Sequence, residues 1–136
     1  MKYLAILAFL FAPLFAAAGV PPEKPNTVLI HPGEVIYARF DESGAELRLV
    51  NVSKEEDENA QLVLTMRPFD KGRAMQMLSV RSSFKKTMNY KAEMMLPGRN
   101  RRQKTSVIPV MAGLISFESW PHPIEELALF GFVLDQ

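Results

Sequence analysis

The chain contains no cysteine among its 136 residues. It therefore forms no disulfide, carries no thiol nucleophile and offers no thiolate ligand to a metal ion. A lipoprotein anchor is excluded as well, because the lipidated residue of that class is a cysteine beside the cleavage site. A hydrophobic core must therefore hold the fold together without covalent cross-links.

Net charge is nearly absent. The chain has 16 Lys and Arg residues against 15 Asp and Glu residues. One of the basic residues is Lys2, in a segment that we expect to be removed, so the remaining chain is formally neutral. Nucleic acids and anionic membrane surfaces select for a strong basic excess, and neither is expected as the main partner.

The chain has one long apolar run, Tyr3–Phe15, whose 13 residues fall short of the roughly 20 that span a bilayer as a helix. A positive Met1-Lys2 start precedes the run, and Ala16–Ala18 follows it with small residues at a cleavage site. The pattern predicts a secretory signal peptide over residues 1–18, cleaved after Ala18. An exported domain without disulfides favours a bacterial periplasmic or secreted protein with no stable membrane anchor.

The rest of the chain divides into a short lead-in and one domain. Residues 19–26 contain Pro21, Pro22 and Pro25 and are expected to be extended. Residues 27–136 are expected to form a single domain, long enough to build a core without covalent cross-links.

Within that domain the apolar residues follow the period of two that is typical of strands. The clearest case is Met88–Leu96, in which every second residue is apolar. Further strands are expected over Thr27–His31, Glu34–Phe40, Glu46–Val52, Ala60–Arg67, Ala74–Ser82 and Leu127–Leu134. The segment Thr105–Glu118 contains Pro109 and Gly113, and is expected to form two short strands or one bulged edge strand.

Helical patterning is missing: no segment of ten or more residues carries an apolar stripe. About eight short strands at regular spacing predict an all-β, antiparallel β-sandwich of the immunoglobulin-like type. A small closed β-barrel is the alternative.

Two segments stand out by charge. Residues 54–58 carry a formal charge of −3, and residues 99–104 carry +4 directly after a Pro-Gly turn. Such runs are commonly solvated loop tips. The alternative is that Arg99, Arg101, Arg102 and Lys104 bind an anionic envelope polymer, a phosphorylated lipid headgroup or an acidic protein.

The segment 117–123 is the most site-like part of the sequence. It brings together Glu118, Trp120 and His122 in a stretch stiffened by two prolines. A rigid loop loses little entropy on binding, and Trp is enriched at binding hot spots. The alternative is that Trp120 plugs one end of the sandwich.

Catalytic motifs are absent. No Gly-x-Ser-x-Gly or Ser-x-x-Lys pattern frames a nucleophile, and both histidines precede a proline. We expect a protein that is not an enzyme. If it is instead a small periplasmic hydrolase, His122 is the better candidate for the general base, because it lies near Trp120 and Glu118.

No cofactor is expected either, with copper as the alternative. Met75 and Met77 would share one face of a strand, and His31 from a neighbouring loop would complete a set of soft ligands that suits Cu(I). Methionines elsewhere, at Met66, Met88 and Met94, fall on faces that alternation assigns to the core.

These observations predict an exported, non-enzymatic binding protein of the bacterial envelope. Its partner is expected to be another envelope protein, a secreted hydrolase that it inhibits, or a cell-wall component. The edge strand containing Pro109 and Gly113 is a second docking feature, since unpaired strand edges accept partner strands. The oligomeric state is left open.

Overall fold

The structure is a computed structural model that describes residues 24–136. The predicted signal peptide, residues 1–18, lies outside the described residues, as does most of the predicted lead-in. No helix in the described part of the chain is long and apolar enough to cross a membrane.

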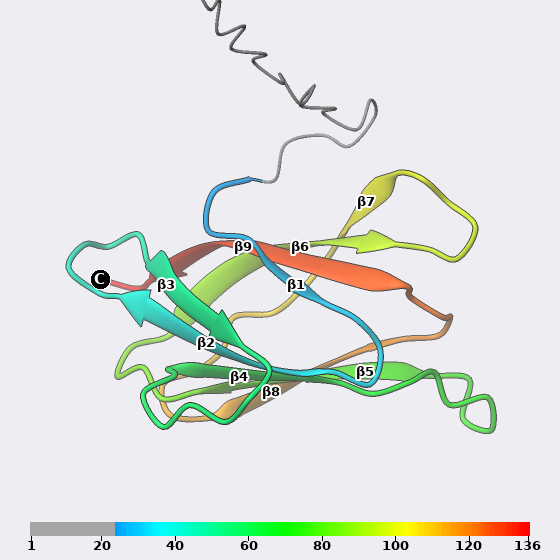
Figure 1. Cartoon of the computed structure of the whole chain (residues 1–136), viewed down its shortest axis with the longest axis horizontal. Helices are drawn as coiled ribbons and strands as arrows, with labels where there is room; N and C mark the ends of the chain where they lie inside the picture. Colours follow the sequence, from blue (N-terminus) through cyan, green and yellow to red (C-terminus); the bar gives the residue numbers. More distant parts are fainter. Residues whose placement is uncertain (1–23) are drawn as a thin grey trace, which may run out of the picture.

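The described chain forms nine strands in two antiparallel sheets that pack face to face as a β-sandwich (Figure 1). The strands are β1 (Val28–Ile30), β2 (Val35–Asp41), β3 (Arg48–Ser53), β4 (Leu62–Met66), β5 (Gln76–Ser82), β6 (Met88–Met95), β7 (Arg102–Thr105), β8 (Ile115–Trp120) and β9 (Glu126–Leu134).

One sheet has four strands in the order β1-β9-β6-β7, and the other has five in the order β3-β2-β4-β5-β8. The predicted β-sandwich is therefore confirmed, with nine strands instead of about eight. The closed barrel that the pattern left open does not form in residues 24–136, because each sheet keeps two free edges.

The expected strands coincide with observed ones to within about two residues, except over Thr105–Glu118. There the chain forms only the last residue of β7, then a connection, then β8 from Ile115 onward. Pro109 lacks an N–H, and Gly113 adopts a positive φ of 67°, so the chain turns between the two sheets at this point. The basic run is corrected too, because Arg102 and Lys104 belong to β7 instead of a loop tip.

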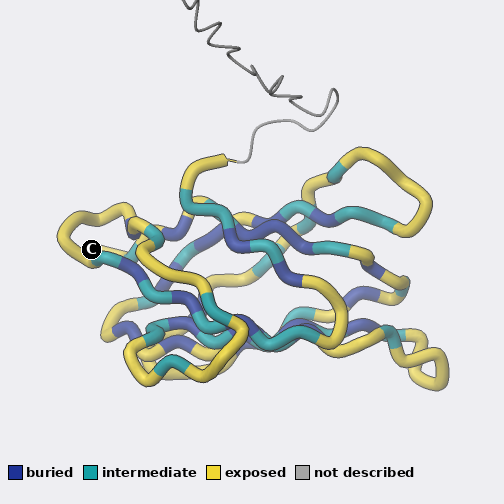
Figure 2. The backbone as a smooth tube through the Cα atoms, viewed as in Figure 1, coloured by how far each residue is buried: buried dark blue, intermediate teal, exposed yellow. Residues whose placement is uncertain are grey.

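The core lies between the sheets and is built by alternation, so that buried and less buried residues follow one another along most strands (Figure 2). Phe132 of β9 is central. Its ring centroid lies 4.9 Å from that of Phe40 in β2 and 6.1 Å from that of Tyr90 in β6. The contact with Phe40 joins the two sheets, and the contact with Tyr90 lies within the four-stranded sheet.

The connections gather at two ends of the sandwich. We call one the hairpin end, formed by the β1–β2, β4–β5, β6–β7 and β8–β9 connections. We call the other the cleft end, formed by the β2–β3, β5–β6 and β7–β8 connections and the last residues described. The candidate functional residues divide between these ends and the side of the molecule that carries β8.

Candidate interaction site

The free edge of β8 is the first feature of interest. β8 is the last strand of the five-stranded sheet, and β5 is its sole strand neighbour within residues 24–136. The carbonyl of Leu114 accepts a hydrogen bond from the Ser82 N–H, at 3.0 Å, on the β5 side. Since backbone groups alternate in direction along a strand, Ile115, Phe117 and Ser119 turn their N–H and C=O groups away from β5.

Large apolar side chains surround this edge. Phe117 is 59% exposed and Ile115 is 42% exposed. The connection that leads into β8 adds the exposed side chains of Ile108, Met111 and Leu114. An edge of this kind, apolar and unpaired, is typical of a surface that another chain covers.

The outer face of the five-stranded sheet is basic. By register, Ile115 pairs with Arg81 of β5, which pairs with Val63 of β4, which pairs with Tyr37 of β2. Arg39 and Arg67 lie on the same face. The one carboxylate on this face within the strands is Asp41, which already accepts a hydrogen bond from Arg48 at 2.7 Å.

Trp120 ends β8 and lies in the core. It is 7% exposed and belongs to the cluster of buried apolar side chains. Its indole N–H donates to the Thr105 hydroxyl of β7 at 2.8 Å, which links the five-stranded sheet to the four-stranded one. The structure thus places Trp120 as a plug between the sheets.

Glu118 has a structural partner. Its carboxylate accepts a hydrogen bond from the backbone N–H of Ile108 at 2.6 Å, which holds the β7–β8 connection against β8. Burial, and to a smaller extent the charge of this carboxylate, raises the pKa of the Tyr90 phenol well above its usual value.

His122 lies half-buried in the β8–β9 connection. The structure gives its ring one hydrogen bond, between Nδ1 and the Pro123 carbonyl at 3.1 Å. A general base needs a reacting group within hydrogen-bond reach, and among the described residues neither a serine nor a carboxylate hydrogen-bonds to this ring.

The basic residues of the sequence divide into two kinds. Arg99 and Arg101 are exposed at the tip of the β6–β7 hairpin, and Lys104 is exposed on β7 opposite Glu93. Arg102 is half-buried, and its guanidinium contacts the Glu126 carboxylate through Nη2 at 2.6 Å and Nε at 3.1 Å. Arg102 is therefore part of the framework, whereas the other three face solvent.

Glu126 also joins Arg102 to a wider charge network at the hairpin end. His31 contacts Glu126 through Nε2 at 2.9 Å and Glu34 through Nδ1 at 2.8 Å. Lys54 contacts the other oxygen of Glu34 at 2.7 Å. The Lys54 ammonium and the hydrogen bonds from His31, opposed by partial burial, lower the pKa of Glu34 to about 2.

This network bears on the copper alternative. Both ring nitrogens of His31 already contact carboxylates, so metal binding would have to displace one of them. Met75 and Met77 flank the buried Gln76 at the start of β5, and both are half-buried. Within residues 24–136 no group of three or more His, Asp or Glu side chains is arranged to hold a metal ion.

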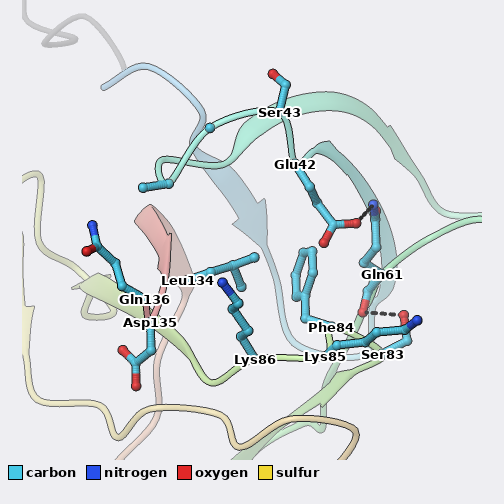
Figure 3. A pocket seen from close by; sticks show the side chains of 12 residues that line it. Glu42, Ser43, Gln61, Ser83, Phe84, Lys85, Lys86, Leu134, Asp135 and Gln136 are labelled. Atoms are coloured by element: carbon cyan, nitrogen blue, oxygen red, sulfur yellow. Dashed lines mark hydrogen bonds between the residues drawn. The ribbon is translucent and has the colours of Figure 1, made fainter.

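A cleft of about 760 Å³ lies at the cleft end, away from every residue that the sequence singled out (Figure 3). Gln61 joins two of its walls, since its side chain donates to Glu42 at 3.3 Å and its carbonyl accepts from Ser83 at 3.4 Å. Phe84 forms an apolar floor, and Lys85 and Lys86 stand on the rim. The cleft opens widely to solvent and carries charges of both signs.

No protein-family model, curated protein or solved structure matches this chain. Function must therefore be inferred from the geometry of the chain itself.

The sequence pointed to the β8 region as an edge strand containing Pro109 and Gly113, and through Glu118 and Trp120 of the segment 117–123. It did not identify Ile115 and Phe117. Ser116, Glu118 and Trp120 alternate with them, but alternation alone would assign Ile115 and Phe117 to the core, and the structure places them on the outer face.

Proposed function

We propose that this chain is an exported, non-enzymatic β-sandwich that works by binding another protein of the bacterial envelope or a secreted protein. The observation that carries the proposal is the free edge of β8, where exposed Ile115 and Phe117 flank unpaired backbone groups. Soluble domains ordinarily protect such edges with charges, prolines or bulges. An edge without that protection is readily explained by a partner that covers it.

The proposal places the protein in the periplasm or outside the cell, on the strength of the predicted signal peptide. We further propose that the sandwich is immunoglobulin-like in architecture. Two packed antiparallel sheets, with a chain that repeatedly passes from one sheet to the other, support this assignment. Such sandwiches share architecture without always sharing strand order.

A photo-crosslinking amino acid placed at Phe117 tests the binding function in envelope extracts. We expect adducts of defined mass whose yield falls when unlabelled protein is added in excess. The matched control carries the cross-linker at Val50, an exposed apolar residue on β3 at the opposite edge of the same sheet. Unsaturable adducts at position 117, or the same adducts from both positions, would contradict the proposal.

A further inference from the structure

We propose that the partner reaches β8 as an extended acidic segment, which adds to the five-stranded sheet as a sixth strand. This inference rests on the proposed binding function and specifies the chemistry of the partner. It is carried by the free backbone groups of β8 and the charge of the sheet face beside them.

The two sheets of the described structure have four edge strands, namely β1, β3, β7 and β8. β1 has only three residues, which is a short template for pairing. β7 carries Arg102 and Lys104, and charged side chains discourage strand pairing. β3 contains a bulge, because Val50 is an extra residue between the pairs Arg39–Asn51 and Phe40–Leu49.

β8 lacks these protections except for one charged residue, Glu118, whose carboxylate is already engaged by the Ile108 N–H. Its six residues pair regularly with β5 along their whole length, without a bulge. The three residues that turn their backbone groups outward, Ile115, Phe117 and Ser119, are all uncharged, and β8 contains no proline. Among the edges of the described structure, β8 is thus the one suited to strand addition.

The basic outer face of the five-stranded sheet favours acidic side chains on an added strand. A sixth strand would place its outward side chains beside Ile115 and Phe117, about 5 Å farther from β5 than β8 itself. Arg81 is exposed and lies directly across from Ile115. A glutamate opposite Ile115 on the added strand can reach the Arg81 guanidinium across β8, because both side chains are long.

Phe117 determines which side chain is favoured at the position of the added strand that lies opposite it. Its cross-strand partner on β5 is Ser79, a small residue, so one side of the exposed ring is left uncovered. An apolar side chain on the added strand would pack against this ring. The inner face of the added strand would meet the Glu118 side, where a second carboxylate is unfavourable. The preferred segment therefore alternates acidic and apolar residues on one face and carries neutral residues on the other.

A peptide of sequence Glu-Thr-Phe-Thr-Glu-Thr-Phe-Thr-Glu meets these requirements and serves as the probe. Its binding to the purified protein is measured by fluorescence anisotropy, beside a version with lysine in place of glutamate and a version N-methylated at every residue, which blocks both strand edges. We expect saturable binding of the acidic peptide, weaker binding of the lysine peptide, and none of the N-methylated one, which cannot complete the backbone hydrogen bonds.

Variants of the protein locate the site. Ser119→Pro removes one outward N–H from an edge strand, where proline is tolerated, and should weaken acidic peptide binding about tenfold. Phe117→Asp should weaken it as well, because it removes the apolar contact and repels the acidic segment, and it serves where the proline variant does not fold. Arg81→Glu should weaken binding about fivefold and favour the lysine peptide, whereas Arg101→Glu, the same charge change at the hairpin tip, should alter neither.

Binding of the N-methylated peptide with the same affinity, or no response to Ser119→Pro and Phe117→Asp, would overturn strand addition. A dimer in sedimentation velocity that Phe117→Asp dissociates would overturn it too, because a second copy would then occupy the edge. If no peptide binds while the cross-linker at Phe117 still gives saturable adducts, only the strand is refuted. If the cross-linker at Phe117 gives no saturable adducts either, the binding function itself is refuted.

Discussion

At the scale of single residues, several side chains that looked functional in the sequence turn out to hold the fold together. Trp120 is buried between the sheets, Glu118 anchors a connection, and Arg102 pairs with Glu126. The sequence singled them out by their surroundings, since Trp120 and Glu118 lie in a proline-stiffened segment and Arg102 lies in a basic run. The residues that the structure leaves available, Ile115 and Phe117, are ordinary apolar types whose exposure no sequence pattern states.

Trp120→Ala should destabilise the domain by about 3–5 kcal/mol, because it leaves a cavity between the sheets and orphans the Thr105 hydroxyl. Urea unfolding followed by circular dichroism measures the loss. The control is His122→Ala, two residues away, which should change stability by less than about 0.5 kcal/mol. Equal effects of the two substitutions would mean that Trp120 is not a structural plug.

Glu34 should make stability depend on acid pH. Its pKa in the folded protein is about 2, below the ordinary value of 4.5. The carboxylate therefore contributes stability that is fully present above pH 4.5 and is lost as the pH falls through 2. We expect Glu34→Gln to lower stability at neutral pH and to flatten the fall between these two values.

Unfolding midpoints in urea, measured at several pH values across that range, test this expectation. Glu58→Gln is the control, because Glu58 is an exposed residue of the β3–β4 connection and has the same chemistry. A Glu34→Gln curve that parallels the wild-type curve would show that Glu34 is not the group responsible.

At the scale of elements, alternation predicted most strands because each has one face in the core and the other near solvent. Leu127–Leu134 looked apolar on both faces, and the structure supplies the reason. β9 carries a bulge in which Gly131 and Phe132 together lie opposite Tyr90, between the pairs Lys91–Phe130 and Asn89–Val133. The extra residue reverses the alternation, so Leu129 and Phe132, three apart in sequence, both face the core.

The edge of β8 was harder to predict for a related reason. Whether a strand lies at an edge depends on sheet order, which is set by contacts between distant parts of the chain. The sequence located turns at Pro109 and Gly113 but could not say that β8 pairs with β5 alone. Local pattern thus predicts strands, whereas the interaction site depends on topology.

Gly131→Ala should cost about 1–2 kcal/mol of stability. Gly131 has φ of 64°, where a side chain is strained, while a Cβ there would only touch the Lys91 side chain at 3.6 Å. The matched control is Gly44→Ala, since Gly44 has no positive φ and its Cβ would lie 3.8 Å from the Glu46 carbonyl. Thermal unfolding that shifts equally in both variants would show that the bulge does not require glycine.

At the scale of the whole molecule, three kinds of contact join the two sheets, namely aromatic packing, a side-chain hydrogen bond and a chain of ion pairs. Aromatic packing around Phe132 joins them in the core, and the Trp120–Thr105 hydrogen bond joins them near β8. At the hairpin end, a chain of charges runs from Lys54 and Glu34 beside the five-stranded sheet, through His31, to Glu126 and Arg102 of the four-stranded sheet. Trp120 takes part in one of these junctions through its inward side chain, whereas the outward backbone groups of β8 take part in none, so a partner can pair with them without disturbing the fold.

Within the basic run of residues 99–104, Arg102 pairs with Glu126 and stabilises the fold, whereas Arg101 faces solvent. Arg102→Ala should destabilise the domain by about 1–2 kcal/mol, because it leaves the half-buried Glu126 with His31 as its remaining ion-pair partner. Arg101→Ala, one residue away at the exposed hairpin tip, should change stability by less than about 0.5 kcal/mol. Chemical unfolding of both variants at low and high salt is the measurement. If the two arginines cost the same, the ion pair between Arg102 and Glu126 adds nothing to stability, and the whole basic run acts as solvated surface charge.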